Sequence, residues 1–183
     1  MTPKEKPMTR LSIAPDQFLC APFHQWNDCW FLLCAGTLSS SRFNIMTVAW
    51  GGFGVLWSKP VVWVAVRPSR YTYEFMERYE SFTLSAFPAA FQPKLSLCGS
   101  KSGREINKVE ASGLTPIPSS HVEAPGFDEA ELILECRKIH FEDLNPDHFL
   151  DQRIEENYNG SNYHRLYTGE VLAISGTPAY QRR

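Results

Sequence analysis

Two short stretches of the sequence combine small residues with cations in a way that could bind an anion. The first is Gly99-Ser-Lys-Ser-Gly-Arg104, which carries two positive charges and leads to a helix that we expect to begin near Glu105. Backbone N–H groups in such a loop, next to a helix N-terminus, are typical of a nest for phosphate. A plain glycine-rich turn with solvated charges has the same composition. The loop alone leaves both interpretations open.

The second stretch contains Arg67, Arg70 and Thr72, which directly follow the apolar run Val61–Val66. This run is β-branched or aromatic at all but Ala65, as is typical of a strand covered on both faces. Loops that follow the end of a rigid strand are where ligand sites normally lie. Arg70 could equally be a solvated surface charge.

Two further residues could take part in redox chemistry. Cys98 precedes the glycine-rich loop, and His164 begins the last apolar run of the chain. Most free cysteines are inert core residues, and a histidine at the rim of a barrel often makes only a local hydrogen bond. The other histidines, His24, His121, His140 and His148, show no metal-ligand spacing, so we expect no metal site.

The elements that must position these residues are mainly strands. We expect strands over residues 30–37, 45–50, 61–67, 81–87, 131–141 and 164–174. Gly51, Gly52 and Gly54 predict a loose connection between the second and third of these strands. Several strands with few helices predict a mainly β fold, an antiparallel barrel that is closed or partly closed.

Short helices are expected over residues 73–79, 93–97 and 105–111, with Thr72 as the N-cap of the first and Gly113 as the end of the last. Residues 114–127 and 150–163 are rich in turn formers and are expected to be irregular, the second as a mobile flap. Residues 16–26 are too apolar to lie free in water, so we expect them to pack on the barrel or on a partner subunit.

Composition restricts the class of protein. The chain has 183 residues, 43% of them hydrophobic and 21% charged, which predicts one globular domain over 1–183 with a mobile tail over 1–10. A net charge of −2 gives no indication of nucleic-acid binding. No segment reads as a signal peptide or a membrane span, and five cysteines without a C-x-x-C pair favour reduced thiols in the cytoplasm.

Several short motifs agree in order and spacing with one known family. They are Asn44-x-Met-Thr-x-x-Trp50, Ser58-x-Pro60, Val66-Arg-Pro-x-Arg-x-Thr72 and Cys98-Gly-Ser-Lys-Ser-Gly-Arg-Glu-x-Asn-Lys108. With these motifs, from about Ser12 to Val171, the chain resembles the flavin reductase-like family on its flavoredoxin side. The resemblance implies an FMN-binding split barrel.

The resemblance also implies the roles of particular residues. It implies that the phosphate and ribityl chain of a noncovalent FMN are held by Arg67, Ser69, Arg70, Thr72, Cys98, Ser100, Lys101 and Ser102. The flavin ring would be lined by Asn44, Met46, Thr47, Val48, Ala49 and Trp50. His164 would face the nicotinamide side of the flavin as a catalytic residue.

The implied activity is reduction of flavin by NAD(P)H in a homodimer, with the flavin near the subunit interface. An FMN electron carrier that is reduced by a protein donor, and a flavin-binding module without turnover, are the alternatives. Since the sequence has no G-x-G-x-x-G fingerprint, NAD(P)H would have to bind without a Rossmann domain.

Overall fold

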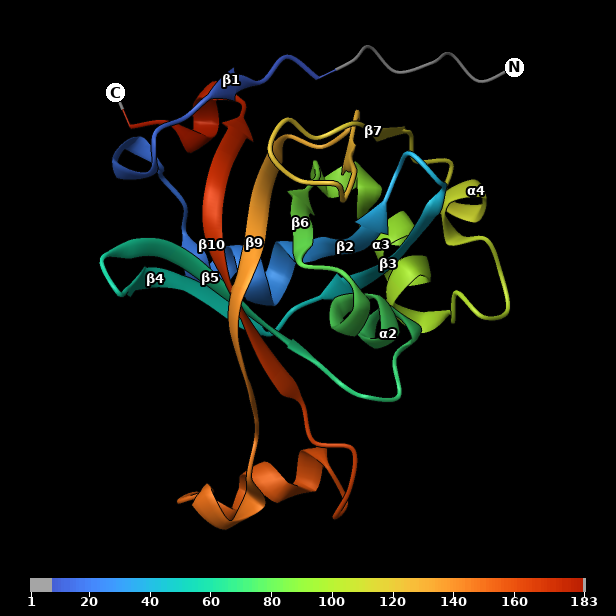
Figure 1. Ribbon diagram of the computed structural model, residues 1–183, viewed down its shortest axis with the longest axis vertical. Coiled ribbons are helices and arrows are strands. Elements are labelled where there is room, and N and C mark those ends of the chain that lie inside the picture. Colours follow the sequence, from blue (N-terminus) through green and yellow to red (C-terminus); the bar gives the residue numbers. More distant parts are fainter. Residues whose placement is uncertain (1–7, 183) are drawn as a thin grey trace.

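The computed structural model describes residues 8–182, and its main feature is one strongly twisted antiparallel sheet (Figure 1). In spatial order the strands are β3 (Arg42–Val48), β2 (Phe31–Thr37), β6 (Ser81–Ala86), β9 (Leu132–Asp143), β10 (Arg165–Gly176), β5 (Lys59–Val66) and β4 (Gly51–Leu56). A short β1 (Leu11–Ser12) pairs with β10. The mainly β antiparallel fold and the six predicted strands are confirmed, with ends shifted by a few residues.

The prediction of a loose connection at Gly51, Gly52 and Gly54 is wrong. Residues 51–56 form strand β4, which pairs with β5 in a hairpin. A Cβ atom on Gly51 would lie 2.4 Å from the Trp26 ring, and one on Gly52 would lie 2.3 Å from the Trp63 ring. These glycines therefore let indole rings pack against a strand. The hairpin turns at Trp57 and Ser58, which have φ of 51° and 57°.

Apolar side chains pack on both faces of the sheet. The barrel interior includes Phe31, Leu33, Val64 and Leu134, and the other face of β2 packs through Leu32 under helix α3 (Gln92–Ser100). Strand β2 is buried on both faces because it lies between these two clusters.

Several of the predicted helix boundaries are wrong. Helix α2 (Tyr71–Arg78) begins two residues before the predicted start, so Thr72 lies inside it and is not the N-cap, and Arg70 occupies the capping position without a side-chain bond. Helix α3 extends three residues beyond the predicted end, through Ser100. Gly99 lies within it, close to Thr47 of β3, where a Cβ atom would lie 3.2 Å from the Thr47 side chain.

Helix α4 (Lys108–Ser112) begins three residues after Glu105, because the Asn107 side chain accepts a hydrogen bond from the N–H of Glu110. The glycine-rich loop therefore does not open directly into a helix at Glu105. The end of α4 at Gly113, with φ of 62°, is confirmed.

The segments predicted to be irregular contain short regular pieces. Within 114–127, β7 (Pro116–Ile117) pairs with β8 (Gly126–Phe127). Residues 144–163, here called the arm, contain the 3-10 turns Pro146–His148 and Gln152–Asn157, and extend the β9–β10 hairpin away from the sheet (Figure 1). Other short turns lie at Pro15–Gln17, Ala89–Phe91 and Pro178–Tyr180.

The apolar segment 16–26 packs on the barrel, which is one of the two arrangements predicted for it. It forms α1 (Pro22–His24) and a π-helical turn (Gln25–Cys29), and the Trp26 ring lies 4.8 Å from that of Phe31. Of the predicted mobile tail, residues 1–7 lie outside the described residues, and Arg10 is fixed because it donates to the carbonyls of Asp128 and Ala130 at 2.8 and 2.6 Å. Within residues 8–182, no helix has the length and hydropathy of a membrane span.

Candidate functional site

The candidate site follows the free edge of strand β3, which ends the sheet on one side. The Ile45 carbonyl accepts a hydrogen bond from Lys108 Nζ at 2.9 Å, so the backbone of Ile45 faces away from β2. In an antiparallel pair, the N–H and C=O of one residue point to the same side, and alternate residues point the same way. Phe43 and Thr47 therefore also present backbone groups to this edge.

A small cavity, here called the phosphate cavity, lies against this edge where α2 begins and α3 ends. Its volume is about 70 Å³, and it is lined by Met46, Ser69, Arg70, Tyr71, Thr72, Lys101, Ser102, Gly103 and Lys108. The lining includes three cations and no carboxylate. The cavity is too small for a drug-sized ring system, which needs at least roughly 300 Å³, but it suits a small anionic group at the N-terminus of α2.

Six predicted site residues meet in this cavity: Met46, Ser69, Arg70, Thr72, Lys101 and Ser102. Hydrogen bonds fix several of them. Arg70 donates to the Gly99 carbonyl at 2.8 Å, which ties the start of α2 to the end of α3. The buried Asn44 side chain donates to the Thr72 hydroxyl at 2.8 Å, so Asn44 supports the cavity from β3.

Lys108 lines the cavity but was not among the predicted site residues, and the same is true of Tyr71 and Gly103. Lys108 is only 6% exposed, and its Nζ also donates to the Cys98 carbonyl at 2.7 Å. Burial lowers the pKa of Lys108 to about 8, and nearby Arg70 acts in the same direction. Since an ammonium has three donors, one remains for a ligand. Its place at the end of the Cys98–Lys108 motif is the signal that could have identified it.

Other predicted residues lie near the cavity but are engaged elsewhere. Cys98 contributes its backbone, while burial raises the pKa of its thiol, so the thiol stays protonated. The Thr47 hydroxyl donates to the Leu95 carbonyl of α3. Ser100 lies in the last turn of α3, where its hydroxyl donates to the Leu97 carbonyl at 3.3 Å.

Arg67 does not line the phosphate cavity but contacts the arm. It donates to the Asn157 carbonyl at 2.8 Å, and its guanidinium lies 5.1 Å from the Tyr158 ring centroid. Ser69, which does line the cavity, also bonds the arm, since its hydroxyl accepts from Asn162 at 2.9 Å. The Arg67–Ser69 segment thus connects the cavity to the arm.

His164 lies where the arm returns to β10. It is 8% exposed, its Nδ1 lies 2.9 Å from the Tyr158 hydroxyl, and its ring lies 4.8 Å from the half-exposed Trp50 indole. Burial, assisted by the positive charges of Arg67 and Arg70, lowers the pKa of His164 to about 4. The imidazole is therefore neutral at pH 7.

The remaining residues of the predicted ring wall divide between core and surface. Met46 and Val48 belong to the barrel core, and of the two only Met46 also lines the phosphate cavity. Ala49 lines a separate, mainly apolar cavity of about 570 Å³ beside Trp26 and Trp63. Trp50 is 46% exposed and offers an aromatic surface next to His164.

Comparison with known proteins identifies relatives of this chain. A flavin reductase like domain matches residues 32–182. An uncharacterized protein of Archaeoglobus fulgidus is 26% identical over 138 residues, covering 75% of this chain and 68% of that protein. One of Pyrococcus abyssi is 29% identical over 135 residues, covering 72% and 65%. The chain thus spans about two thirds of the length of these relatives.

Two solved structures have a similar fold. Flavoredoxin of Desulfovibrio vulgaris has 25% identity and a TM-score of 0.64, with 88% of this chain and 73% of that chain covered. An FMN-binding domain of a flavin reductases-like enzyme from Shewanella baltica has 17% identity and a TM-score of 0.68, with 94% and 79% covered. Since the matched domain occupies most of the sequence, this chain belongs to the flavin reductase-like family and has its split-barrel fold.

Proposed function

We propose that this protein binds FMN noncovalently and catalyses its reduction by NAD(P)H. The observation that carries the proposal is the phosphate cavity at the start of α2, where Arg70, Lys101 and Lys108 converge without a carboxylate. A phosphomonoester carries nearly two negative charges at neutral pH. Charge-assisted hydrogen bonds from these cations, together with the N-terminus of α2, fit such a group.

The rest of the flavin would lie along the β3 edge toward Trp50. At this edge the backbone of Thr47 offers a donor and an acceptor, which suit the polar edge of a flavin ring. FMN, when bound, supplies the ring that accepts a hydride. The task of the chain is then to hold that ring and to place a nicotinamide beside it.

His164 suits the second task as a positioning residue. A histidine with a pKa of about 4 carries no charge at pH 7, so it can make a hydrogen bond to a nicotinamide but is a poor proton donor there. Its contact with Tyr158 fixes the ring orientation, and its contact with Trp50 supports this role, because Trp50 is one of the residues proposed to bound the flavin.

The titration of FMN against riboflavin tests the cavity. Lys101→Ala should weaken FMN binding about tenfold or more, because a hydrogen bond to a charged group contributes roughly 1.5–3 kcal/mol, and should leave riboflavin binding unchanged. Lys94→Ala removes a lysine that lies on α3 outside the cavity and serves as the matched control. Equal losses for both ligands would contradict the assignment.

A second candidate function is an FMN electron carrier that a protein donor reduces. The similarity to a protein named flavoredoxin supports it. Stopped-flow mixing of the FMN-loaded protein with NADH and with NADPH distinguishes the two functions. Reduction within seconds supports the reductase, whereas no reduction by either nucleotide supports the carrier.

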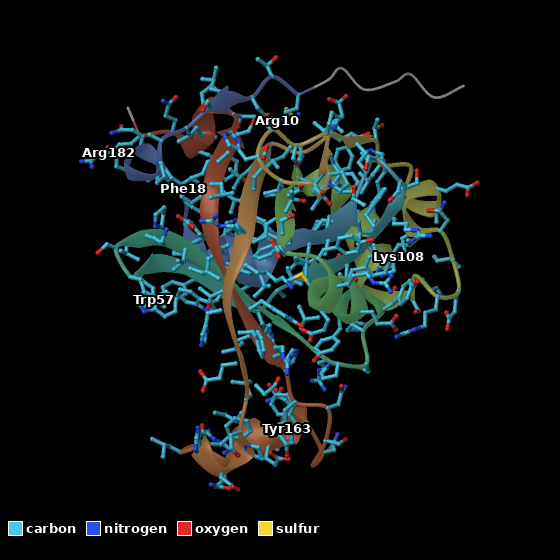
Figure 2. All side chains as sticks on the ribbon, in the orientation of Figure 1. Arg10, Phe18, Trp57, Lys108, Tyr163 and Arg182 are labelled. Carbon is cyan, nitrogen blue, oxygen red and sulfur yellow. The ribbon has the colours of Figure 1, made fainter. Side chains whose placement is uncertain are left out.

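We further propose a cytoplasmic single-domain protein that pairs as a homodimer. Large apolar side chains are exposed, with Trp50 beside His164 at 46% and Trp57 at 58%. Trp57 lies at the tip of the β4–β5 hairpin (Figure 2). A second copy would cover these rings and bury the flavin. Light scattering in solution tests this, and a monomer at micromolar concentration would exclude a stable dimer.

A further inference from the structure

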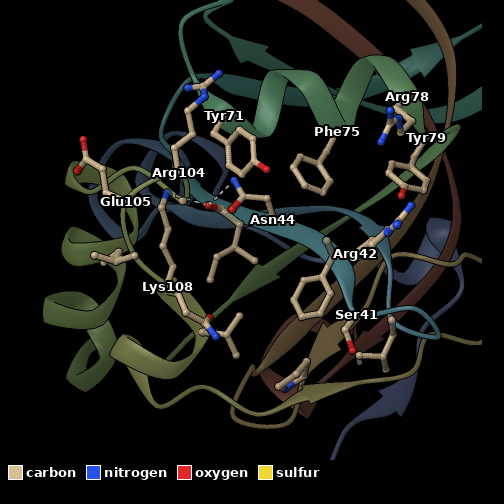
Figure 3. Close-up of a pocket in the computed structure, with 18 residues that line it drawn as sticks. Ser41, Arg42, Asn44, Tyr71, Phe75, Arg78, Tyr79, Arg104, Glu105 and Lys108 are labelled. Atoms are coloured by element: carbon tan, nitrogen blue, oxygen red, sulfur yellow. Dashed lines mark hydrogen bonds between the residues drawn. The ribbon is translucent and has the colours of Figure 1, made fainter.

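A second and larger cavity, here called the groove, continues from the phosphate cavity along the β3 edge. It has a volume of about 850 Å³ and lies between α2, the start of β3 and residues 103–109 (Figure 3). It shares Tyr71, Gly103 and Lys108 with the phosphate cavity. A volume of this size lies within the usual range for small-molecule sites.

Two cations line the groove without a partner in the described chain. Arg42 comes from the start of β3 and Arg78 from the end of α2, and neither makes a side-chain hydrogen bond or ion pair with residues 8–182. Both guanidinium groups point toward the Tyr79 side of the groove, while Glu105 lies at the opposite end (Figure 3). Arg78 also borders a neighbouring cavity with Glu80 and Glu123, but it pairs with neither. This end of the groove thus has a local excess of positive charge.

The wall between the two ends is aromatic. Phe43, Phe75 and Tyr79 line it, and the rings of Phe75 and Tyr79 are stacked at 15° with centroids 6.2 Å apart. A flat heterocycle stacks favourably on such rings. The backbone of Phe43 on the free strand edge offers an N–H and a C=O to the edge of a base.

We propose that the groove binds the adenosine monophosphate part of a dinucleotide, with the base against Phe75 and the phosphate at Arg42 and Arg78. This rests on the proposed function, because it assumes that the flavin phosphate lies in the adjoining cavity. Adenylate could come from FAD, whose second half would extend from the phosphate cavity into the groove. It could also come from the adenosine half of the nicotinamide nucleotide.

Calorimetric titration with AMP tests the groove directly. AMP should bind the FMN-loaded wild type, and the double variant Arg42→Ala, Arg78→Ala should weaken AMP binding at least tenfold. Both arginines are exposed, so the variant should fold, and its affinity for FMN should stay within about twofold. Arg182→Ala, near the chain end, is the matched charge control.

Two further titrations distinguish the sources. If FAD occupies the groove, the double variant loses affinity for FAD and not for FMN. If the nicotinamide nucleotide occupies it, the FMN-loaded variant loses affinity for NADP⁺ or NAD⁺. Its affinities for FAD and for FMN then both stay at the wild-type values. Absence of AMP binding to the wild type, equal AMP binding to the variant, or loss of AMP binding with no change for either dinucleotide would overturn the proposal. Because FMN titration is read separately, failure of the flavin site is distinguishable from failure of the groove.

Discussion

The phosphate cavity and the arm differ in how the chain holds them. The cavity is built on the body of the molecule, and its residues are fixed by buried hydrogen bonds such as Lys108 to Ile45 and Asn44 to Thr72. The arm extends away from the sheet, with Tyr163 far from Lys108 in Figure 2, and contacts the site through Arg67, Ser69 and His164. Segments with few buried contacts open more readily than a packed core. We therefore expect the cavity to determine cofactor affinity and the arm to determine reaction rate.

The largest effect should come from His164. His164→Ala should lower the rate of flavin reduction by NAD(P)H by about 10²-fold, the size expected when a reactant is held out of position, with FMN affinity nearly unchanged. Stopped-flow absorbance on the loaded wild type and variant measures it. If both proteins are reduced at the same rate, His164 has no role in positioning.

Arg70 lines the phosphate cavity and does not belong to the arm. Arg70→Ala should weaken FMN binding by roughly 10- to 100-fold, because it removes a charge-assisted hydrogen bond and the bond that joins α2 to α3. The reduction rate at saturating FMN should change little. A large fall in that rate with unchanged affinity would reverse the assignment of the two regions. Fluorescence titration combined with single-turnover kinetics separates the two quantities.

Lys108 makes the affinity of the cavity depend on pH. Since its pKa is about 8, FMN affinity should fall as pH rises above 8, by up to about tenfold per unit. The apo protein should show the opposite trend. Its unfolded state binds more protons between pH 8 and 10.5, so the free energy of unfolding rises over that range. Lys108→Met should abolish both trends, and titrations and urea unfolding across pH 7–10 measure them.

The smallest effect should come from the contacts between the arm and the barrel. Arg67→Met removes an exposed bond to the Asn157 carbonyl and the contact of the guanidinium with the ring of the buried Tyr158. Exposed charged contacts contribute up to about 1 kcal/mol, so the reduction rate should fall only a few-fold. FMN affinity should remain within twofold. A loss of FMN affinity comparable to that of Arg70→Ala would place Arg67 at the phosphate after all.

The sequence by itself was sufficient for six of the strands and for much of the site. Runs such as Val61–Val66 are β-branched and apolar, and this local property identifies a buried strand without further context. The Arg67–Thr72 and Cys98–Lys108 motifs likewise identified five of the residues that line the phosphate cavity, and the Asn44–Trp50 motif identified Met46.

Only the tertiary structure decided what the glycines and several polar side chains do. Gly51 and Gly52 belong to a strand that pairs with β5, and they leave room for the rings of Trp26 and Trp63. Gly99 lies within a helix and close to Thr47. Lys108 is held at the cavity because it donates hydrogen bonds to the carbonyls of Ile45 and Cys98. Arg67 contacts the arm because it donates to the Asn157 carbonyl. Each of these contacts joins segments that local sequence patterns treat separately, since whether a group is buried and what it bonds depend on the packing of the whole chain.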